Sequence, residues 1–160
     1  MAQHTVYLSG MIVPGENATF YRKKVAKKFQ EAGFRILDPL RAKGKRIAQG
    51  AYRPGEIIQR DIQDVLACKE AGFVFAVMLK SAMDKKVSIG TPSEIAVAWY
   101  NHIPVVFVTD DEVLAEHLWI RAMCGRIFLI KDASVEGVFD EAVNYSINWY
   151  GPASEKECVE

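Results

Sequence analysis

The sequence has few cysteines, no excess of charge of either sign and no long apolar run. Its 160 residues contain three cysteines, widely spaced, so neither a disulfide framework nor a zinc site of paired cysteines is expected. The 20 basic residues balance the 20 acidic ones, whereas a protein that binds a nucleic-acid polymer needs a basic surplus. No apolar stretch approaches the ~20 residues of a membrane helix. We therefore expect a soluble, cytoplasmic protein with reduced thiols, no metal and no membrane partner.

Several familiar binding and catalytic motifs are also missing. The sequence has no GxGxxG motif and no Walker motif, so it does not predict dinucleotide or nucleoside triphosphate binding by those devices. It has no GxSxG motif either, which argues against a serine nucleophile on a strand-to-helix elbow. The charge balance does not argue against a small anionic ligand, because local groups decide its binding.

Apolar runs typical of strands alternate with amphipathic segments typical of helices. This alternation predicts an α/β protein with a single-domain, flavodoxin-like three-layer fold, in which helices cover both faces of a five-stranded parallel sheet. The domain is expected to span residues 1–150 and to be followed by a tail at 151–160. Strands are expected at residues 5–9, 34–37, 73–79, 104–109 and 126–130, and helices at 17–32, 56–71, from about 92 onward, 111–123 and 134–150.

The segment from Ser88 to Trp99 is the most informative part of the sequence. It follows an apolar strand after a short polar loop and then opens a helix, which is where open α/β sheets bind their ligands. Free backbone N–H groups and the positive end of a helix favour an anion at such a position. Gly90 lets a ligand approach the backbone closely, and Ser88 and Thr91 offer hydroxyls. Glu94 lies one turn inside the expected helix.

Three carboxylates are candidates for chemistry at the same edge of the sheet. Asp38 follows the second expected strand, Asp61 lies one turn into the helix after a long basic loop, and Glu94 opens the next helix. Each also has an ordinary structural explanation. Asp38 precedes a proline in a turn, Asp61 can pair with neighbouring basic side chains, and Glu94 can complement the helix dipole. Composition and spacing leave both interpretations open for all three residues.

Other polar and aromatic candidates also have both a structural and a functional interpretation. Tyr7 in the first strand is either a core residue or a ligand contact. The basic loop at residues 41–55 is either a solvated loop or a lid over an anion. His102 and His117 are expected on the surface, where His117 would become buried if copies of the chain associate.

Five short motifs stand out by their order and spacing. They are Val-Tyr-Leu-Ser-Gly at 6–10, Leu-Asp-Pro-Leu-Arg at 37–41, Arg-Asp-Ile at 60–62, Ser-Ile-Gly-Thr-Pro-Ser-Glu at 88–94 and Pro-Val-Val at 104–106. Together they resemble the nucleoside 2-deoxyribosyltransferase family, which includes relatives that hydrolyse nucleoside 5′-monophosphates at the N-glycosidic bond. The resemblance extends over residues 5–130, most of the chain.

The resemblance implies catalytic roles for three side chains. Glu94 matches the glutamate that attacks the anomeric carbon of the sugar, so the implied reaction passes through an oxocarbenium-like transition state and a covalent glycosyl-enzyme. Asp61 matches the aspartate that handles the proton on the base. Tyr7 matches the tyrosine that positions the nucleophile and the sugar. No cofactor is implied.

The residue at position 88 indicates which class of substrate the protein binds. The resemblance implies that an aspartate six residues before the nucleophile holds a free 5′-hydroxyl in the transferases, whereas the monophosphate hydrolases carry a serine, as this chain does at Ser88. An aspartate would repel a phosphate dianion, so Ser88, Gly90 and Thr91 favour a nucleotide over a nucleoside.

The remaining substrate contacts are expected around the ends of the first two strands. Gly10 and Asp38 are expected to bind the substrate. The hydrolases often have an arginine just after the glycine that matches Gly10, and this chain has Met11 instead. Phosphate binding is therefore expected to use a residue of the basic loop, which is Arg41, Lys43 or Arg53.

The resemblance also implies a homodimer or larger homo-oligomer with shared active sites. His117 is expected to meet the ligand of the adjacent subunit, with Trp119 and Met123 at the interface. The expected function is cleavage of the N-glycosidic bond of a (deoxy)nucleoside 5′-monophosphate or (deoxy)nucleoside, with the base released to water or exchanged for another base. The alternative is a non-catalytic nucleotide-binding module on the same fold.

Overall fold

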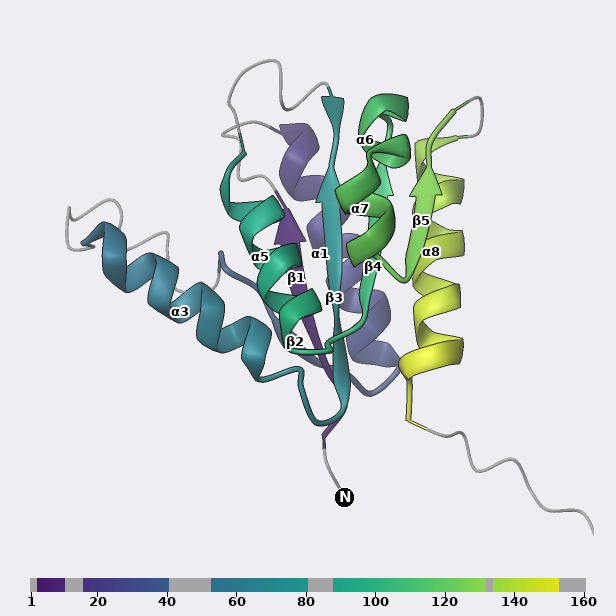
Figure 1. Cartoon of the computed structure of the whole chain (residues 1–160). Coiled ribbons are helices and arrows are strands. Elements are labelled where there is room, and N and C mark those ends of the chain that lie inside the picture. The colour runs from purple at the N-terminus through teal and green to yellow at the C-terminus, as the bar shows by residue number, and fades with distance from the viewer. Residues whose placement is uncertain (1–2, 11–15, 41–52, 81–87, 132–133, 153–160) are drawn as a thin grey trace, which may run out of the picture.

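A computed structural model describes residues 3–10, 16–40, 53–80, 88–131 and 134–152 of the chain. Most of the basic loop lies outside these residues, and so does Arg41, one of the candidates for binding a phosphate. The tail from residue 153 lies outside them as well. The described residues form one sheet flanked by helices (Figure 1).

A five-stranded sheet forms the centre of the described structure. Its strand order is β2-β1-β3-β4-β5, and every neighbouring pair is parallel. The central strands β3 and β4 are buried on both faces, which explains their almost continuous apolar sequence. The expected α/β fold class is thereby confirmed. The strands are β1 (Thr5–Gly10), β2 (Arg35–Leu37), β3 (Gly72–Met78), β4 (Val105–Thr109) and β5 (Arg126–Leu129).

Helices cover both faces of this sheet (Figure 1). One face carries α1 (Glu16–Glu31) and α8 (Val135–Tyr150). The opposite face carries α3 (Pro54–Leu66), α5 (Gly90–Tyr100), α6 (Glu112–Glu116) and α7 (Leu118–Met123). None of the helices within the described ranges is long and apolar enough to cross a membrane.

The side chains of β1 alternate between the two cores that hold these layers together. Val6 and Leu8 belong to the core beneath α1 and α8, whereas Tyr7 belongs to the core beneath α3, α5 and α7. Aromatic rings dominate the first core, where Phe29 of α1 packs edge to face on Phe73 of β3 with ring centroids 5.5 Å apart. The odd-numbered side chains at the end of β1 therefore face α5.

Helix boundaries follow local capping. Gly33 has a φ of +87°, a left-handed conformation that suits glycine, and it lies two residues beyond α1. The expected helix at 111–123 is wrong, because the chain becomes extended at His117 and forms α6 and α7 instead. The Asp111 carboxylate caps α6 and the His117 ring caps α7, so each short helix has its own N-terminal cap.

The connections between strands change direction between β1 and β3. From β1 the chain crosses through α1 to β2, whereas from β3 it crosses through α5 to β4 on the other side. Open parallel sheets bind their ligands beyond the carboxyl ends of the strands at such a point. The carboxyl ends of β1 and β3, together with the start of α5, are therefore the expected place of a functional site.

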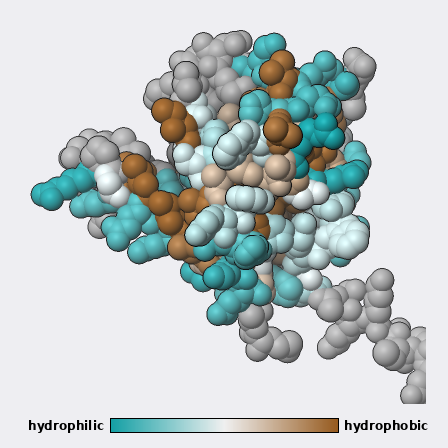
Figure 2. All heavy atoms as spheres, in the orientation of Figure 1, coloured by the Kyte–Doolittle hydropathy of each residue, from teal (hydrophilic) through white to brown (hydrophobic). Residues whose placement is uncertain are grey.

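Exposed apolar side chains occur on the face that carries α3, α5 and α7. Ile58 on α3, Trp99 on α5 and both Leu118 and Trp119 on α7 are all exposed. Figure 2 shows a hydrophobic strip along α3 and further hydrophobic atoms over the upper part of this face. A monomer with this face open leaves several large apolar side chains in contact with water.

Candidate active site

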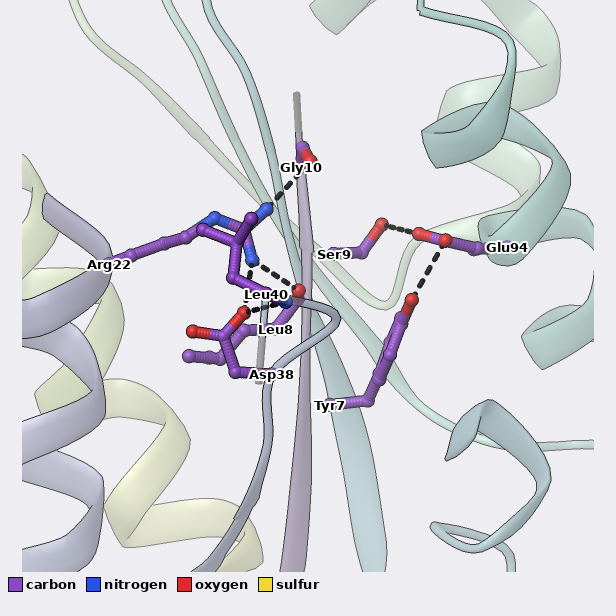
Figure 3. A network of polar contacts seen from close by, with 8 residues as sticks. All are labelled: Tyr7, Leu8, Ser9, Gly10, Arg22, Asp38, Leu40 and Glu94. Carbon is purple, nitrogen blue, oxygen red and sulfur yellow. Dashed lines mark hydrogen bonds and ion pairs between the residues drawn. The ribbon is translucent and has the colours of Figure 1, made fainter. Parts of the chain in front are cut away.

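Two hydroxyl groups from β1 hold the carboxylate of Glu94. The Tyr7 hydroxyl donates a hydrogen bond to Glu94 Oε1 over 2.8 Å, and the Ser9 hydroxyl donates to Glu94 Oε2 (Figure 3). Tyr7 and Ser9 are both buried, whereas Glu94 is half-buried. Each carboxylate oxygen therefore has a fixed donor, and the group is oriented before any ligand arrives.

The local sequence explains how these three side chains meet. Tyr7 and Ser9 lie two residues apart on one strand, so their side chains emerge on the same face of the sheet. Glu94 lies in the second turn of α5, whose buried residues Thr91 and Ile95 fix that helix against the sheet. The distance along the chain between β1 and α5 is large, so only the tertiary fold brings them together.

Burial and two carboxylates keep the Tyr7 hydroxyl protonated. Desolvation is the largest cause that raises the pKa of Tyr7 above its ordinary value, and the negative charges of Glu94 and then Asp61 raise it further. The phenol therefore acts as a hydrogen-bond donor throughout the neutral range. The negative charge of Asp61 thus acts on the same hydroxyl as that of Glu94.

Asp61 reaches the site from α3. This helix begins with Pro54 at its first position, which suits a helix start, and Asp61 follows two turns later as a half-buried residue. α3 packs against α5, the helix that carries Glu94. Of the three residues expected to be catalytic, Tyr7 and Glu94 are hydrogen-bonded, and Asp61 lies on a helix packed against that of Glu94 and its charge acts on Tyr7.

The residues expected to bind a phosphate lie at the first turn of α5. The Ser88 hydroxyl donates to the Thr91 hydroxyl over 3.2 Å, and Thr91 is buried. A Cβ placed on Gly90 would meet no atom within 4 Å, so the space beside this backbone is open. Within the described residues no side chain caps the N-terminus of α5, because Ile89 precedes it. The helix start is a suitable place for an anion.

Asp38 and Gly10 both contact Arg22, a residue of α1. The Arg22 guanidinium donates to Asp38 Oδ1 over 3.0 Å and to the Gly10 carbonyl over 2.6 Å. Asp38 also accepts a hydrogen bond from the Leu40 N–H over 2.8 Å, as its position in a turn predicts. Both residues therefore have structural partners, and their expected contact with a substrate stays a prediction.

The other expected binding residues stand apart from this group. Arg41 is not among the described residues, and Arg53 is an exposed residue directly before α3. His117 is exposed between α6 and α7, where its ring accepts a hydrogen bond from the Trp119 N–H. Its expected contact with a neighbouring subunit stays a prediction.

Sequence reasoning missed Ser9 and Arg22. Ser9 had a signal, since it lies two residues after Tyr7 in an expected strand and must share its face. The sequence signal for Arg22 was weaker. Arg22 falls three and seven residues before Val25 and Phe29, and so lies on the buried side of α1.

The described residues give no sign of a metal centre. No group of three or more His, Cys, Asp or Glu side chains in the described part of the chain could hold a metal ion. Cys68 and Cys124 are buried free thiols, and burial raises the pKa of each to about 12. Neither thiol is therefore an activated nucleophile.

Comparisons with known proteins agree with this architecture. No protein-family model matches the chain, and no curated protein matches its sequence. A conserved protein from Enterococcus faecalis V583 is similar in structure, with 18% identity and a TM-score of 0.59 over 90% of this chain and 99% of that one. A 2-deoxyribosyltransferase from Bacillus psychrosaccharolyticus is similar with 14% identity and a TM-score of 0.56 over 84% of this chain and 95% of that one.

A third similar structure comes from a different functional class. It is the sugar isomerase domain of an RpiR transcription factor from Sphaerobacter thermophilus, with 11% identity and a TM-score of 0.50 over 93% of this chain and 72% of that one. At these identities the likeness concerns the fold. The protein shares its fold with a 2-deoxyribosyltransferase, as the order of its sequence motifs implied.

Proposed function

We propose that the protein cleaves the N-glycosidic bond of a (deoxy)nucleoside 5′-monophosphate or (deoxy)nucleoside, with Glu94 as the nucleophile. The observation that carries this proposal is the pair of hydrogen bonds from Tyr7 and Ser9 to the two oxygens of Glu94. A glutamate that only complements a helix dipole needs no such partners. Its place at the carboxyl ends of the strands and the shared fold of a 2-deoxyribosyltransferase support the same function.

The reaction has two steps. In the first, a carboxylate oxygen of Glu94 bonds to C1′ of the sugar while the bond from C1′ to the base nitrogen breaks. The electron pair of that bond goes to the base, and Asp61 gives the base its proton. In the second, water attacks C1′, Asp61 takes a proton from it, and the ester bond to Glu94 breaks. When a second base takes the place of water, the outcome is base exchange.

Tyr7 and Ser9 serve both steps through the Glu94 carboxylate. Their hydroxyls fix its orientation before attack, which lowers the entropy cost of reaching the reactive geometry. They also stabilise the negative charge that returns to the carboxylate when the glycosyl ester breaks. Because the Tyr7 pKa is raised, this donor is available throughout the neutral range.

The start of α5 selects the substrate in this proposal. Ser88, Gly90 and Thr91 surround an open, uncapped helix N-terminus, which favours the 5′-phosphate of a nucleotide. The counter-charge is assigned to the basic loop, where Arg41, Lys43 and Arg53 are the candidates. We also assign a homodimer, since Leu118 and Trp119 are exposed beside His117 and would be covered by a second copy.

A panel of nucleosides and nucleoside 5′-monophosphates tests this proposal. Incubation with the purified protein should release free base, detected by chromatography, and release from monophosphates should exceed that from nucleosides. Glu94→Gln keeps the size of the side chain and should lower the rate by roughly three orders of magnitude. Glu112→Gln is the matched control, because Glu112 is an exposed glutamate in the first turn of α6, paired with Lys131.

Two outcomes contradict the proposal. Base release by Glu94→Gln at the wild-type rate would exclude the nucleophile. Tight nucleotide binding by the wild-type protein without any base release, even on prolonged incubation, would support the non-catalytic nucleotide-binding module instead.

A further inference from the structure

Among the described residues, the end of β1 beyond Tyr7 has a neighbouring strand on one side alone. β1 pairs with β3 along its whole length, up to Gly10 opposite Val77. Its pairing with β2 stops earlier, at Tyr7 opposite Leu37. Of the strands in the described part of the chain, only β3 therefore neighbours the last three residues of β1, because β2 ends before them. Buried backbone carbonyls without a strand partner need another donor.

Arg22 of α1 supplies that donor. Its Nη1 donates to the Leu8 carbonyl over 2.9 Å, and its Nη2 donates to the Gly10 carbonyl over 2.6 Å. The guanidinium is a planar fork, so it holds two carbonyls in one fixed geometry. These two carbonyls belong to the residues on either side of Ser9. Figure 3 shows Arg22 on one side of β1, and Ser9 pointing from the other side to Glu94.

The charge of Arg22 is compensated at the end of β2. Arg22 is 2% exposed, and a charge this deeply buried needs a partner. Asp38, the residue directly after β2, accepts from its Nη1 over 3.0 Å. The ion pair thus occupies the place where β2 would continue beside β1. It joins α1, the end of β1 and the end of β2 into one unit.

The surroundings of this fork are tightly packed. A Cβ on Gly10 would lie 2.7 Å from the Tyr21 hydroxyl and 3.3 Å from Arg22 Nη2, so only glycine fits there. Tyr21 in turn stacks on Phe139 of α8, with ring centroids 5.0 Å apart. Burial raises the pKa of Tyr21, although the adjacent Arg22 charge partly offsets this effect. The guanidinium has little room to move.

We propose that Arg22, with Asp38 as its counter-charge, is a positioning residue that fixes the end of β1 so that the Ser9 hydroxyl meets Glu94. This inference rests on the proposed function for its catalytic meaning. Arg22 itself does not reach the reacting atoms. It acts through the Leu8 and Gly10 carbonyls and then through the Ser9 side chain between them.

Titration of Glu94 tests the inference without any substrate. Glutamate labelled with ¹³C at the carboxyl carbon is followed by NMR, and the Glu94 signal is identified by its loss in Glu94→Gln. Loss of a donor disfavours the ionised carboxylate, so Ser9→Ala should move the titration midpoint up by roughly one pH unit. Arg22→Lys keeps the charge but lacks the two guanidinium nitrogens that hold both carbonyls. It should move the Glu94 titration midpoint in the same direction by a smaller amount.

A double variant distinguishes positioning from a general structural role. If Arg22 acts through Ser9, Arg22→Lys should cause no further shift of the Glu94 midpoint in a Ser9→Ala background. Lys27→Met is the control, because Lys27 is an exposed basic residue of the same helix, paired with Glu31 over 3.7 Å, and should leave the midpoint unchanged. Should Arg22→Lys fail to fold, Asp38→Asn answers the same question by weakening the ion pair.

The results separate this inference from the proposed function. A folded Arg22→Lys variant with a wild-type Glu94 midpoint overturns the inference, and so does a shift that adds fully to that of Ser9→Ala. Base release by Glu94→Gln overturns the proposed function but leaves the titration as a valid test of positioning. In an active enzyme, Arg22→Lys should lower kcat about 10-fold with little change in KM.

Discussion

The two ends of the candidate site are built differently. We call the part around Glu94 the reaction end, and the start of α5 around Ser88 and Thr91 the anion end. At the reaction end, both oxygens of Glu94 are held by donors from a buried strand, Tyr7 and Ser9. At the anion end, Ser88 and Thr91 share one hydrogen bond of 3.2 Å, and the space beside Gly90 is open. Under the proposed function, this difference means that chemistry depends on fixed side chains, whereas substrate binding depends on an accessible helix start.

This comparison separates the kinetic effects of substitutions at the two ends. Changes at the reaction end should alter kcat, because they affect the orientation and charge of Glu94 in the transition state. Changes at the anion end should alter KM and the preference for a phosphate, because they affect binding alone. A substitution at one end that has the kinetic effect expected of the other end contradicts the comparison.

Tyr7→Phe should have the largest effect of the three substitutions that probe this comparison. It removes one hydrogen bond to a charged carboxylate but keeps the ring in the core, so kcat should fall roughly 10- to 100-fold with little change in KM. Steady-state kinetics of base release measures both constants. Tyr100→Phe is the control, because Tyr100 is an exposed tyrosine on α5. A rise in KM with unchanged kcat would contradict the assignment of Tyr7 to the reaction end.

The same substitution has a consequence for stability at high pH. The Tyr7 pKa is raised in the folded protein, so above the ordinary tyrosine pKa of 10.0 the unfolded chain loses a proton that the folded one retains. The free energy of unfolding therefore falls with rising pH in this range, by about 1.4 kcal/mol per unit for this group. Chemical denaturation between pH 9 and 11 should show a shallower decline for Tyr7→Phe. An unchanged slope would contradict the burial of this phenol.

The sequence predicted the fold class for a physical reason. Apolar runs between amphipathic segments are a strong signal, and five such runs became the five strands. Tyr7 and Glu94 could be paired only through the family resemblance, because no local pattern links residues 87 positions apart. Ser9 was missed, although strand alternation puts it on the same face as Tyr7.

Other features could not be predicted from local patterns. Arg22 looked like one more charge on an amphipathic helix, because the need for a buried donor arises only where β2 ends before β1. The break at His117 carries neither glycine nor proline, so the helix at 111–123 seemed continuous. α3 ends at Leu66 rather than at residue 71, and α5 starts at Gly90 rather than near 92, which is the usual error at helix ends.

Ser88→Asp should have an intermediate effect, confined to the anion end. An added carboxylate beside the start of α5 repels a phosphate dianion, so KM for a nucleoside 5′-monophosphate should rise about 10-fold or more. KM for the matching nucleoside should stay the same or fall, and kcat should change little. Ser93→Asp is the control, because Ser93 is exposed on the same helix and bonds to the Ile89 carbonyl. Equal effects on nucleoside and monophosphate would show that position 88 does not meet the phosphate.

Thr91→Val should have the smallest effect and gives the sharpest test of the comparison. The substitution keeps the shape of a buried side chain and removes the oxygen that accepts from Ser88. Ser88 is only half-buried, so water can satisfy its hydroxyl, and the thermal unfolding midpoint should move by no more than about 2 °C. Losing the orientation of one hydroxyl should raise KM for a monophosphate about fivefold at most, since a neutral hydrogen bond contributes only about 1 kcal/mol. Because Thr91 lies one turn before Glu94 on the same helix, a fall in kcat of the same size would mean that the two ends share one rigid support and are not separable.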